Sequence, residues 1–315
     1  MKSLYHNFRL QQEKLTETNF IFEKPEIYQI KEKIEKIGKP LKKWPIKIYS
    51  GIRTGFNEAF IIDGEKRKEI LDKCKTKGER ERTKKILKPV LRGRDISRYS
   101  YNWEDLWVIG TFPALKLEID DYPSLKEYLK GFGERLKQDG KPGHRCKSNN
   151  KWFETSHTTA YYHEFEKEKI VWQDMAGSPS FVYDKRGYYT LQTAYIMTGS
   201  NLKFLLGVLN SKVAMFYLAQ IAYSLSNGDL RWIKQYVERI PVPSITEENK
   251  KLVEKIEDLV DQILELKKQG KPINEKRIGE LYTEIDNIIY QLYNLTEEEK
   301  KIINEKITKK MIKEL

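Results

Sequence analysis

Two prolines, Pro241 and Pro243, interrupt the chain in the segment IPVPSIT. Proline has no backbone N–H and disfavours helical geometry in the residue before it, so no helix continues through this segment. Before it, short apolar runs alternate with glycine-containing turns, and after it the chain is charged with a helical apolar period. We therefore expect a mixed α/β region over residues 1–244 and a separate helical region over 245–315.

Apolar stripes at four- and three-residue spacing predict two helices in the second region. The first stripe comprises Leu252, Ile256, Leu259, Ile263 and Leu266. The second comprises Ile278, Leu281, Ile285, Ile288, Leu292 and Leu295. The segment QGKP separates them, so we expect an antiparallel helical hairpin with a coiled-coil-like seam. Thr296 and Glu299 have the spacing of a capping box and predict a third helix.

In the first region, the patterns predict short strands and packed helices. A helix is expected over Ile27–Ile37, strands around 46–48 and 58–63 with a loop between them, a helix over 65–77 and a strand over 106–112. Ser124 and Glu127 predict a capping box that opens another helix. Further on we expect a strand meander over 169–199 and a single apolar helix over 201–224.

Composition favours a polyanionic partner and argues against a membrane. The 315 residues carry a formal net charge of +12, which attracts nucleic acid over long range. No run approaches the roughly 18 apolar residues that a membrane span needs, and the N-terminus lacks the apolar core of a signal peptide. We expect a cytoplasmic protein. An excess of solvated lysine is the alternative explanation of the charge.

Sequence signatures of catalysis are missing. The chain has no G-x-x-x-x-G-K-[ST] loop, no G-x-S-x-G elbow, no H-E-x-x-H pair and no Asn-Pro-Pro-Tyr run. Cys74 and Cys146 stand far apart, and the four histidines show no metal-ligand spacing. We therefore expect no catalytic, cofactor or metal site in this chain.

The segment GIRTGFNEAF, residues 51–60, is a candidate recognition loop. Gly51 and Gly55 allow a tight turn that would expose Arg53, Thr54 and Asn57. Arginine and asparagine suit guanine and adenine edges in the major groove, and threonine can contact a phosphate or a base. A plain turn between strands is the alternative.

A second basic cluster lies in LKPVLRGRDISRYS. Its candidate DNA contacts are Lys88, Arg92, Arg94 and Arg98. Arginine can hold a phosphate or a guanine with two parallel hydrogen bonds. Alternatively, Arg94 pairs with Asp95 and the other side chains are solvated.

Three further segments supply candidate contacts. A Gly/Pro-rich basic stretch offers Lys141, Arg145 and Lys147 and could order on a polyanion. The expected strand end VWQD offers Gln173 for adenine and Asp174 for cytosine, while its Trp172 is as well explained by the core. Near the next helix, candidate phosphate anchors are Asn227, Arg231 and Lys234.

Six segments occur in an order that resembles the TaqI-like C-terminal specificity domain. They are IYSGIRTGFNEAFIID, LKPVLRGRDISRYSY, EKIVWQDMAGSPSFVYDKRGYYTLQTAYIMTG, NLKFLLGVLNSKVAMFY, RWIKQYVERIPVP and YQLYNLTEEE. The resemblance runs from about Lys36 to Lys301. This family forms the target recognition part of adenine-specific DNA methyltransferases and of type IIG restriction-modification enzymes.

The resemblance implies a mixed α/β (α+β) target recognition domain with a helical spacer. Such a domain grips double-stranded DNA while a partner methyltransferase domain flips an adenine and methylates it. S-adenosylmethionine and, for cleavage, magnesium would then bind in methyltransferase and nuclease domains outside this chain.

Two other functions stay open at this point. One is a complete small DNA-modifying enzyme of unfamiliar design, which cleavage or S-adenosylmethionine binding by the chain would favour. The other is an RNA-binding or scaffold protein, which a preference for single-stranded RNA over duplex DNA would favour.

Overall fold

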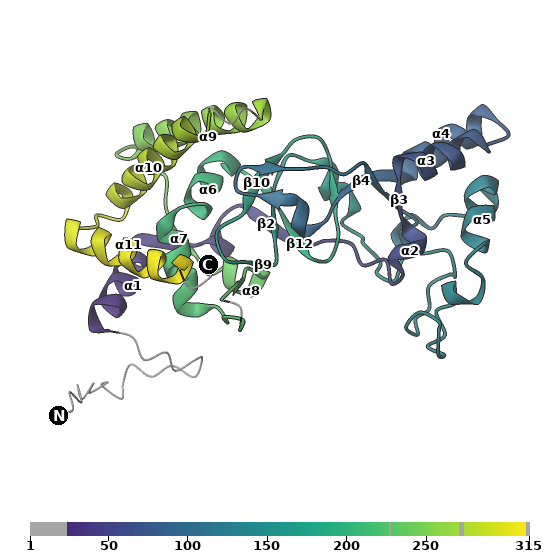
Figure 1. Ribbon diagram of the computed structural model, residues 1–315, viewed down its shortest axis with the longest axis horizontal. Coiled ribbons are helices and arrows are strands. Elements are labelled where there is room, and N and C mark those ends of the chain that lie inside the picture. The colour runs from purple at the N-terminus through teal and green to yellow at the C-terminus, as the bar shows by residue number, and fades with distance from the viewer. Residues whose placement is uncertain (1–23, 227, 271–273, 313–315) are drawn as a thin grey trace.

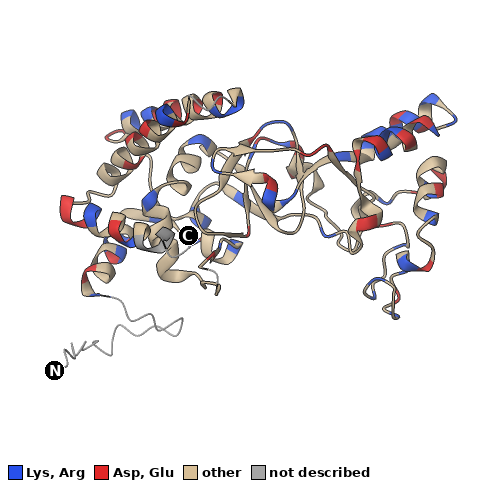
Figure 2. Ribbon diagram, viewed as in Figure 1, with Lys and Arg blue, Asp and Glu red and all other residues tan. Residues whose placement is uncertain are grey.

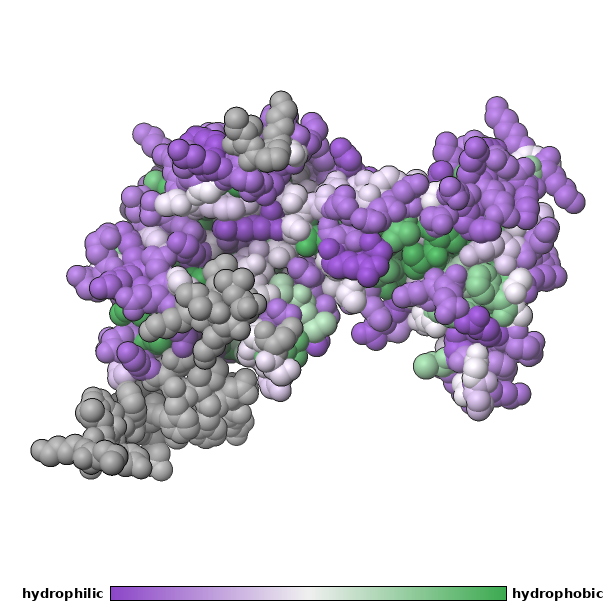
Figure 3. Space-filling view, viewed as in Figure 1, coloured by the Kyte–Doolittle hydropathy of each residue, from purple (hydrophilic) through white to green (hydrophobic). Residues whose placement is uncertain are grey.

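The computed structural model describes residues 24–226, 228–270 and 274–312. The molecule is elongated, with helices gathered at one end, helices α3–α5 at the other and β-strands between them (Figure 1). Hydrophilic side chains cover both ends, and an apolar area lies between them on the face in Figure 3. The expected α/β architecture of short strands and packed helices, with a helical C-terminal segment, is confirmed.

A four-stranded antiparallel sheet occupies the middle of the molecule, in the order β10-β8-β12-β2. Its strands are β2 (Ile46–Ser50), β8 (Lys169–Gln173), β10 (Phe181–Asp184) and β12 (Ala194–Gly199). Ile170 and Trp172 face one apolar cluster and Val171 faces another, so the sheet is buried on both sides. Burial of Trp172 in the core, one of its two expected roles, is what the structure shows.

A second four-stranded sheet has the order β11-β4-β7-β3. Its strands are β3 (Ile61–Asp63), β4 (Leu87–Leu91), β7 (Leu106–Ile109) and β11 (Tyr189–Thr190). Three shorter pairs join β1 (Gly38–Pro40) to β14 (Pro241–Pro243), β5 (Ile96–Ser97) to β6 (Ser100–Tyr101), and β9 (Met175–Ala176) to β13 (Leu230–Arg231). The expected strand near 58–63 begins later, because residues 57–60 form helix α2 (Asn57–Phe60). The loop 51–56 therefore crosses from one sheet to the other.

Three helices cover the second sheet: α3 (Gly64–Asp72), α4 (Lys77–Ile86) and α5 (Pro123–Lys130). The helix expected over 65–77 is wrong in its extent, because Thr76 accepts a hydrogen bond from Glu79 N and starts α4. The capping box at Ser124 is also wrong. Pro123 occupies the first turn of α5, and the Glu79 carboxylate of α4 accepts from Ser124 N at 2.9 Å.

The single apolar helix expected over 201–224 is two helices, α6 (Leu202–Leu209) and α7 (Lys212–Ile221), bent by 67°. Asn210 leaves the helical path because its side-chain amide exchanges two hydrogen bonds with the backbone of Phe181. Ser211 then caps α7 by accepting from Ala214 N. No single described helix could span a membrane; this bent pair has the length and composition of a span, and most of its residues lie in the core.

The C-terminal helices are α9 (Lys250–Gln269), α10 (Asn274–Leu292) and α11 (Glu297–Ile312). Ion pairs Lys255–Glu284 and Lys267–Glu275 fit an antiparallel pairing of α9 with α10. The capping box that opens α11 is confirmed, since Thr296 and Glu299 exchange hydrogen bonds of 2.8 and 3.3 Å.

The apolar faces of α9 and α10 pack against other elements as well as against each other. They share the largest apolar cluster with α1 (Pro25–Ile37), α6, α7 and the central sheet. A Cβ atom at Gly207 of α6 would lie 2.6 Å from Ile256 Cγ2, which shows how closely α6 packs on α9. The domain boundary near residue 244 stays a prediction. Residues from before and after this position share one apolar cluster.

Candidate nucleic-acid interface

Loops between the two sheets enclose an open cleft of about 690 Å³. Its walls come from five parts of the chain: 52–57, 92–94, Ser156, 173–175 and 191–193. Seven predicted contacts line this cleft: Arg53, Thr54, Asn57, Arg92, Arg94, Gln173 and Asp174. The fold thus brings together residues from segments that the sequence analysis singled out separately.

The two glycines of GIRTG allow the loop 51–56 to pass from the first sheet to the second. Gly51 N donates to Ala194 O at 2.8 Å, and a Cβ atom at Gly51 would lie 2.0 Å from Leu191 O. Only glycine fits so close to a neighbouring backbone. Gly55 has φ +77°, a left-handed conformation that turns the chain into α2.

Arg53 and Thr54 have different roles in this loop. Arg53 is exposed in the cleft, and its carbonyl accepts from the Ser156 hydroxyl at 2.9 Å. Thr54 is 2% exposed, accepts from Phe56 N, and donates its hydroxyl hydrogen to Asn57 Oδ1 at 2.6 Å. The prediction that Thr54 itself contacts DNA is therefore corrected: its buried hydroxyl is used within the loop, where it holds the side-chain amide of Asn57.

The LRGRD loop presents one paired and one unpaired arginine. Arg92 forms a bidentate pair with Asp95, with Nε to Oδ2 at 2.9 Å and Nη2 to Oδ1 at 2.6 Å. This hydrogen bonding raises the pKa of Arg92. Asp95 therefore pairs with Arg92, and not with Arg94 as one interpretation of the sequence had it. Within the described residues neither Arg94 nor Arg53 forms an ion pair, and both are exposed.

Gln173 and Asp174 form the cleft wall at the end of β8. Both side chains are partly exposed, and neither side chain forms a hydrogen bond or ion pair with another described side chain. Burial raises the pKa of Asp174, against the opposing effect of the nearby Arg231 guanidinium. The cleft therefore offers arginine donors, amides and one carboxylate acceptor.

Among the lining residues that the sequence analysis did not predict as contacts, three have polar side chains: Ser156, Gln192 and Thr193. Gln192 and Thr193 are exposed in the turn between β11 and β12, which the meander prediction did not resolve. Their polarity inside LQTAYIM is the one available signal. It is weak without the knowledge that β11 belongs to one sheet and β12 to the other.

Part of the chain is similar to a known protein family. Residues 88–242 match the model of the TaqI-like C-terminal specificity domain. Over this matched range the chain is similar to the TaqI-like specificity domain. The resemblance expected from the ordered motifs is thereby confirmed, and the matched range lies inside the expected one. The loop 52–57 precedes the matched segment and completes the cleft of the specificity domain.

Relatives of the chain include three type II methyltransferases. They are M.BstVI of Geobacillus stearothermophilus, M.XhoI of Xanthomonas vasicola and M.PaeR7I of Pseudomonas aeruginosa. M.BstVI is 24% identical over 266 residues, M.XhoI 25% over 220 and M.PaeR7I 27% over 205. The matches cover 82%, 68% and 62% of this chain but only 41%, 36% and 32% of those proteins. The chain thus spans about two fifths or less of the relatives' length.

Two solved structures share the fold. The type IIL restriction-modification enzyme MmeI, in complex with DNA, aligns over 87% of this chain and 36% of its own, with a TM-score of 0.55 and 12% identity. The type IIG restriction endonuclease BpuSI aligns over 86% and 34%, with a TM-score of 0.50 and 14% identity. At these identities the likeness concerns the fold alone.

Lys88 and Arg98 of the specificity domain lie outside the cleft lining. Lys88 Nζ pairs with Glu166 at 2.7 Å. Arg98 donates to Asn210 O at 2.6 Å and lies over the Tyr282 ring, 3.9 Å from its centroid. The prediction of a DNA contact at Arg98 is corrected, because this side chain joins the specificity domain to α10.

The basic stretch 137–151 is organised by a buried arginine. Arg145 is 4% exposed and donates to the carbonyls of Leu136, Thr54, Glu154 and Trp152. Burial lowers its pKa to about 10. Arg145 is therefore a structural residue, which corrects the predicted DNA contact. Lys141 and Lys147 are exposed but do not line the cleft.

The remaining candidates lie near β13. Asn227 falls outside the described residues. Arg231 is part of β13 opposite Met175, and its guanidinium lies 3.7 Å from the Met175 sulfur. Lys234 is exposed at the first residue of α8 (Lys234–Val237). Arg231 thus flanks the cleft through β9, whereas Lys234 stands farther along the chain.

Charge elsewhere on the molecule is mixed. Basic and acidic residues alternate along α3, α4, α9 and α10 on the face shown in Figure 2. The net positive charge is therefore spread over the surface and does not by itself locate an interface. Among the described residues, no group of three or more His, Cys, Asp or Glu side chains could hold a metal ion.

Proposed function

We propose that this chain recognises a specific sequence in duplex DNA for a restriction-modification system. In this proposal it positions the target site for an adenine methyltransferase domain, and a linked nuclease, that lie outside the chain. The cleft carries the proposal, because it gathers arginine, amide and carboxylate side chains from both sheets around one open space. The family match and the methyltransferase relatives support it.

The unpaired cations supply the affinity in this proposal. Arg53 and Arg94 are exposed and have no acidic partner among the described residues, so their guanidinium groups can bind phosphates. Asn57, Gln173 and Gln192 carry amides that can distinguish base edges. The net charge of +12 speeds encounter with DNA but carries no sequence information.

We further propose that S-adenosylmethionine and magnesium act only in the domains outside this chain. The missing sequence signatures of catalysis are the ground for this part of the proposal. In this proposal the chain contributes recognition, the catalytic steps belong to the other domains, and both act in the cytoplasm.

The first test is selection of bound fragments from randomised duplex DNA across a salt series. We expect enrichment of one short motif, with affinity falling by about 10³ to 10⁵ between roughly 50 and 200 mM salt if about six to ten phosphates are contacted. Replacing Arg53 or Arg94 by alanine should weaken binding to all sequences. Each variant should also reduce the slope of log K against log salt by about one.

Arg277→Ala is the matched control. Arg277 is an exposed arginine of α10 whose pair with Glu280 lies on the surface, where such pairs contribute little. Its removal should leave the motif and the salt slope unchanged. Binding without enrichment of a motif would contradict sequence recognition by this chain. A preference for single-stranded RNA would favour the scaffold alternative, and cleavage or cofactor binding by the chain would favour the enzyme alternative.

A further inference from the structure

Asp174 is the one acidic residue among the side chains that line the cleft. The lining includes three arginines, Arg53, Arg92 and Arg94, beside this single carboxylate. A surface built only to attract DNA phosphates gains nothing from a negative charge, because phosphate and carboxylate repel each other. The position of Asp174 therefore indicates that its partner is a group other than a phosphate.

The backbone holds Asp174 firmly in place. Its N–H donates to Thr193 O at 3.0 Å, and its carbonyl accepts from Trp232 N at 2.9 Å. Trp232 is 1% exposed and donates its indole N–H to Ala176 O at 3.0 Å. Asp174 stands between strands β8 and β9, so the carboxylate projects from a rigid frame.

The carboxylate itself lacks a donor side chain. No described side chain forms an ion pair or hydrogen bond with it, and the one backbone donor that acts on it is its own N–H, which already donates to Thr193 O. Arg231 is close enough to affect its titration, but the Arg231 guanidinium contacts the Met175 sulfur instead. A carboxylate can accept about four hydrogen bonds, so a contact with its own N–H leaves acceptor sites that lose water on DNA binding and are costly to leave unsatisfied.

DNA offers few groups that can satisfy this acceptor. The hydrogen-bond donors of the major groove are cytosine N4 and adenine N6, and the phosphates offer none. We infer that Asp174 reads a base, accepting a hydrogen bond from the exocyclic amino group of a cytosine or adenine, while Arg53 and Arg94 contact the backbone. This inference depends on the proposed function and separates base contacts from phosphate contacts within the cleft.

The first experiment repeats the selection from random duplex DNA with Asp174→Asn and Glu248→Gln. Asparagine keeps the shape of the side chain but adds a donor, so the base preference at one position should relax or change by roughly tenfold or more. Glu248 is exposed in the loop before α9 and does not line the cleft. Its variant removes the same charge and should select the same motif as the unchanged protein.

The second experiment deletes the amino group from the DNA. In the selected site, adenine is replaced by purine, or cytosine by 2-pyrimidinone, at the position that the Asp174 variant altered. Binding of the unchanged protein should weaken roughly tenfold, whereas binding of Asp174→Ala, whose side chain has no acceptor, should change much less. Such non-additivity is the signature of a direct contact. Thermal unfolding of each variant checks that the fold is retained.

The outcomes separate the inference from the function on which it depends. If the unchanged protein selects a motif and Asp174→Asn selects the same one with equal discrimination, Asp174 does not read a base and the function still stands. Additive effects of Asp174→Ala and the base analogue would also overturn the inference. If the unchanged protein selects no motif, both the proposed function and the inference fail.

Discussion

At the scale of single residues, a buried hydroxyl sets the orientation of a cleft amide. Thr54 accepts from Phe56 N and donates to Asn57 Oδ1, and the 2.6 Å distance fits an O–H···O bond better than an N–H···O bond. We expect Thr54→Val to lower the free energy of unfolding by about 1–2 kcal/mol, because Phe56 N loses its acceptor. Affinity for the selected DNA site should fall with the salt slope unchanged, as measured by titration.

Thr83→Val is the control for this change. Thr83 is equally buried on α4, but its hydroxyl has no hydrogen-bond partner within the described residues. Its replacement should leave DNA binding intact and cost no stability. Asn57→Ala should reproduce the affinity loss of Thr54→Val, and the double variant should lose no more than either. Independent, additive losses would show that Thr54 does not act through Asn57.

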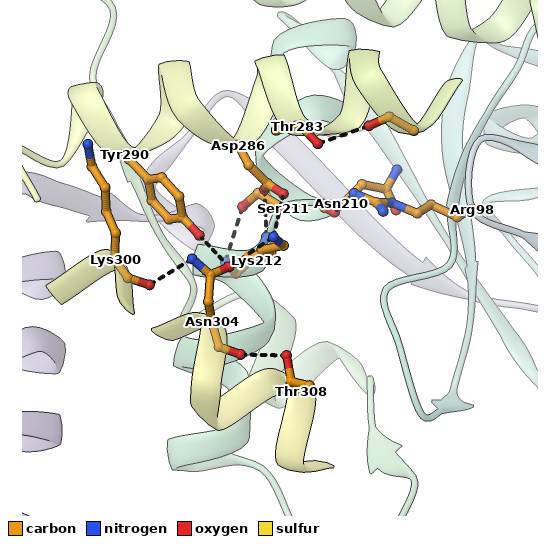
Figure 4. A network of polar contacts seen from close by, with 12 residues as sticks. Arg98, Asn210, Ser211, Lys212, Thr283, Asp286, Tyr290, Lys300, Asn304 and Thr308 are labelled. Carbon is orange, nitrogen blue, oxygen red and sulfur yellow. Dashed lines mark hydrogen bonds and ion pairs between the residues drawn. The ribbon is translucent and has the colours of Figure 1, made fainter. Parts of the chain in front are cut away.

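At the scale of elements, a polar network holds the kink between α6 and α7 against the C-terminal helices (Figure 4). Asp286 of α10 accepts from Lys212 N at 2.9 Å, and Lys212 Nζ donates to Asn304 of α11 at 2.9 Å. Tyr290 and Asn304 add a contact of 3.3 Å between α10 and α11. The start of α7 is therefore tied to both helices.

Burial raises the pKa of Asp286, although Lys212 N–H and the charges of Arg98 and Lys212 oppose the shift. The folded protein then keeps this proton at pH values where the unfolded chain has lost it. Its contribution to stability is present at acid pH and declines as the pH rises from about 4, the ordinary value for aspartate. The advantage of the unchanged protein over Asp286→Asn should therefore shrink with rising pH, as measured by urea unfolding between pH 4 and 7.

Asp258→Asn, on the exposed side of α9, controls for the loss of one negative charge. The difference in the free energy of unfolding between Asp258→Asn and the unchanged protein should not shrink as the pH rises. If the stability difference for Asp286→Asn instead grew with pH, the carboxylate would be stabilised in its charged form, and burial would not be the dominant influence.

At the scale of the whole molecule, the helices after residue 244 complete the core. Helix α9 buries Val253, Ile256, Leu259, Val260 and Ile263. At about 2 kcal/mol for each such side chain, this contribution is near 10 kcal/mol, comparable with the entire stability of a typical domain. We expect a fragment that ends at Ser244 to lack a cooperative thermal transition by circular dichroism.

The 315-residue chain measured in parallel should unfold in a cooperative transition. A fragment with a melting temperature within a few degrees of the full chain would establish the boundary predicted at residue 244 as that of an independent domain. Loss of structure would instead show that the helical segment is part of the folding unit.

Local patterns were enough to predict much of the secondary structure and the family resemblance. The Ile27–Ile37 helix, the stripes of α9 and α10 and the capping box at Thr296 depend on residues three or four positions apart, which the chain displays directly. Ordered motifs predicted the specificity domain in the same way. The break between α6 and α7 was not predicted, because it depends on a hydrogen bond from Asn210 to the distant backbone of Phe181.

Tertiary structure decided which candidate residues can face a ligand. Thr54 and Arg145 are buried, Arg92 is paired, and Arg53 and Arg94 are exposed, although the sequence predicted all five as DNA contacts. These differences depend on contacts across long separations, such as Ser156 with Arg53 over 103 positions and Thr193 with Gly93 over 100. The sequence determined the repertoire of helices, strands and charged groups, and the packing of two sheets determined which of those groups meet at the cleft.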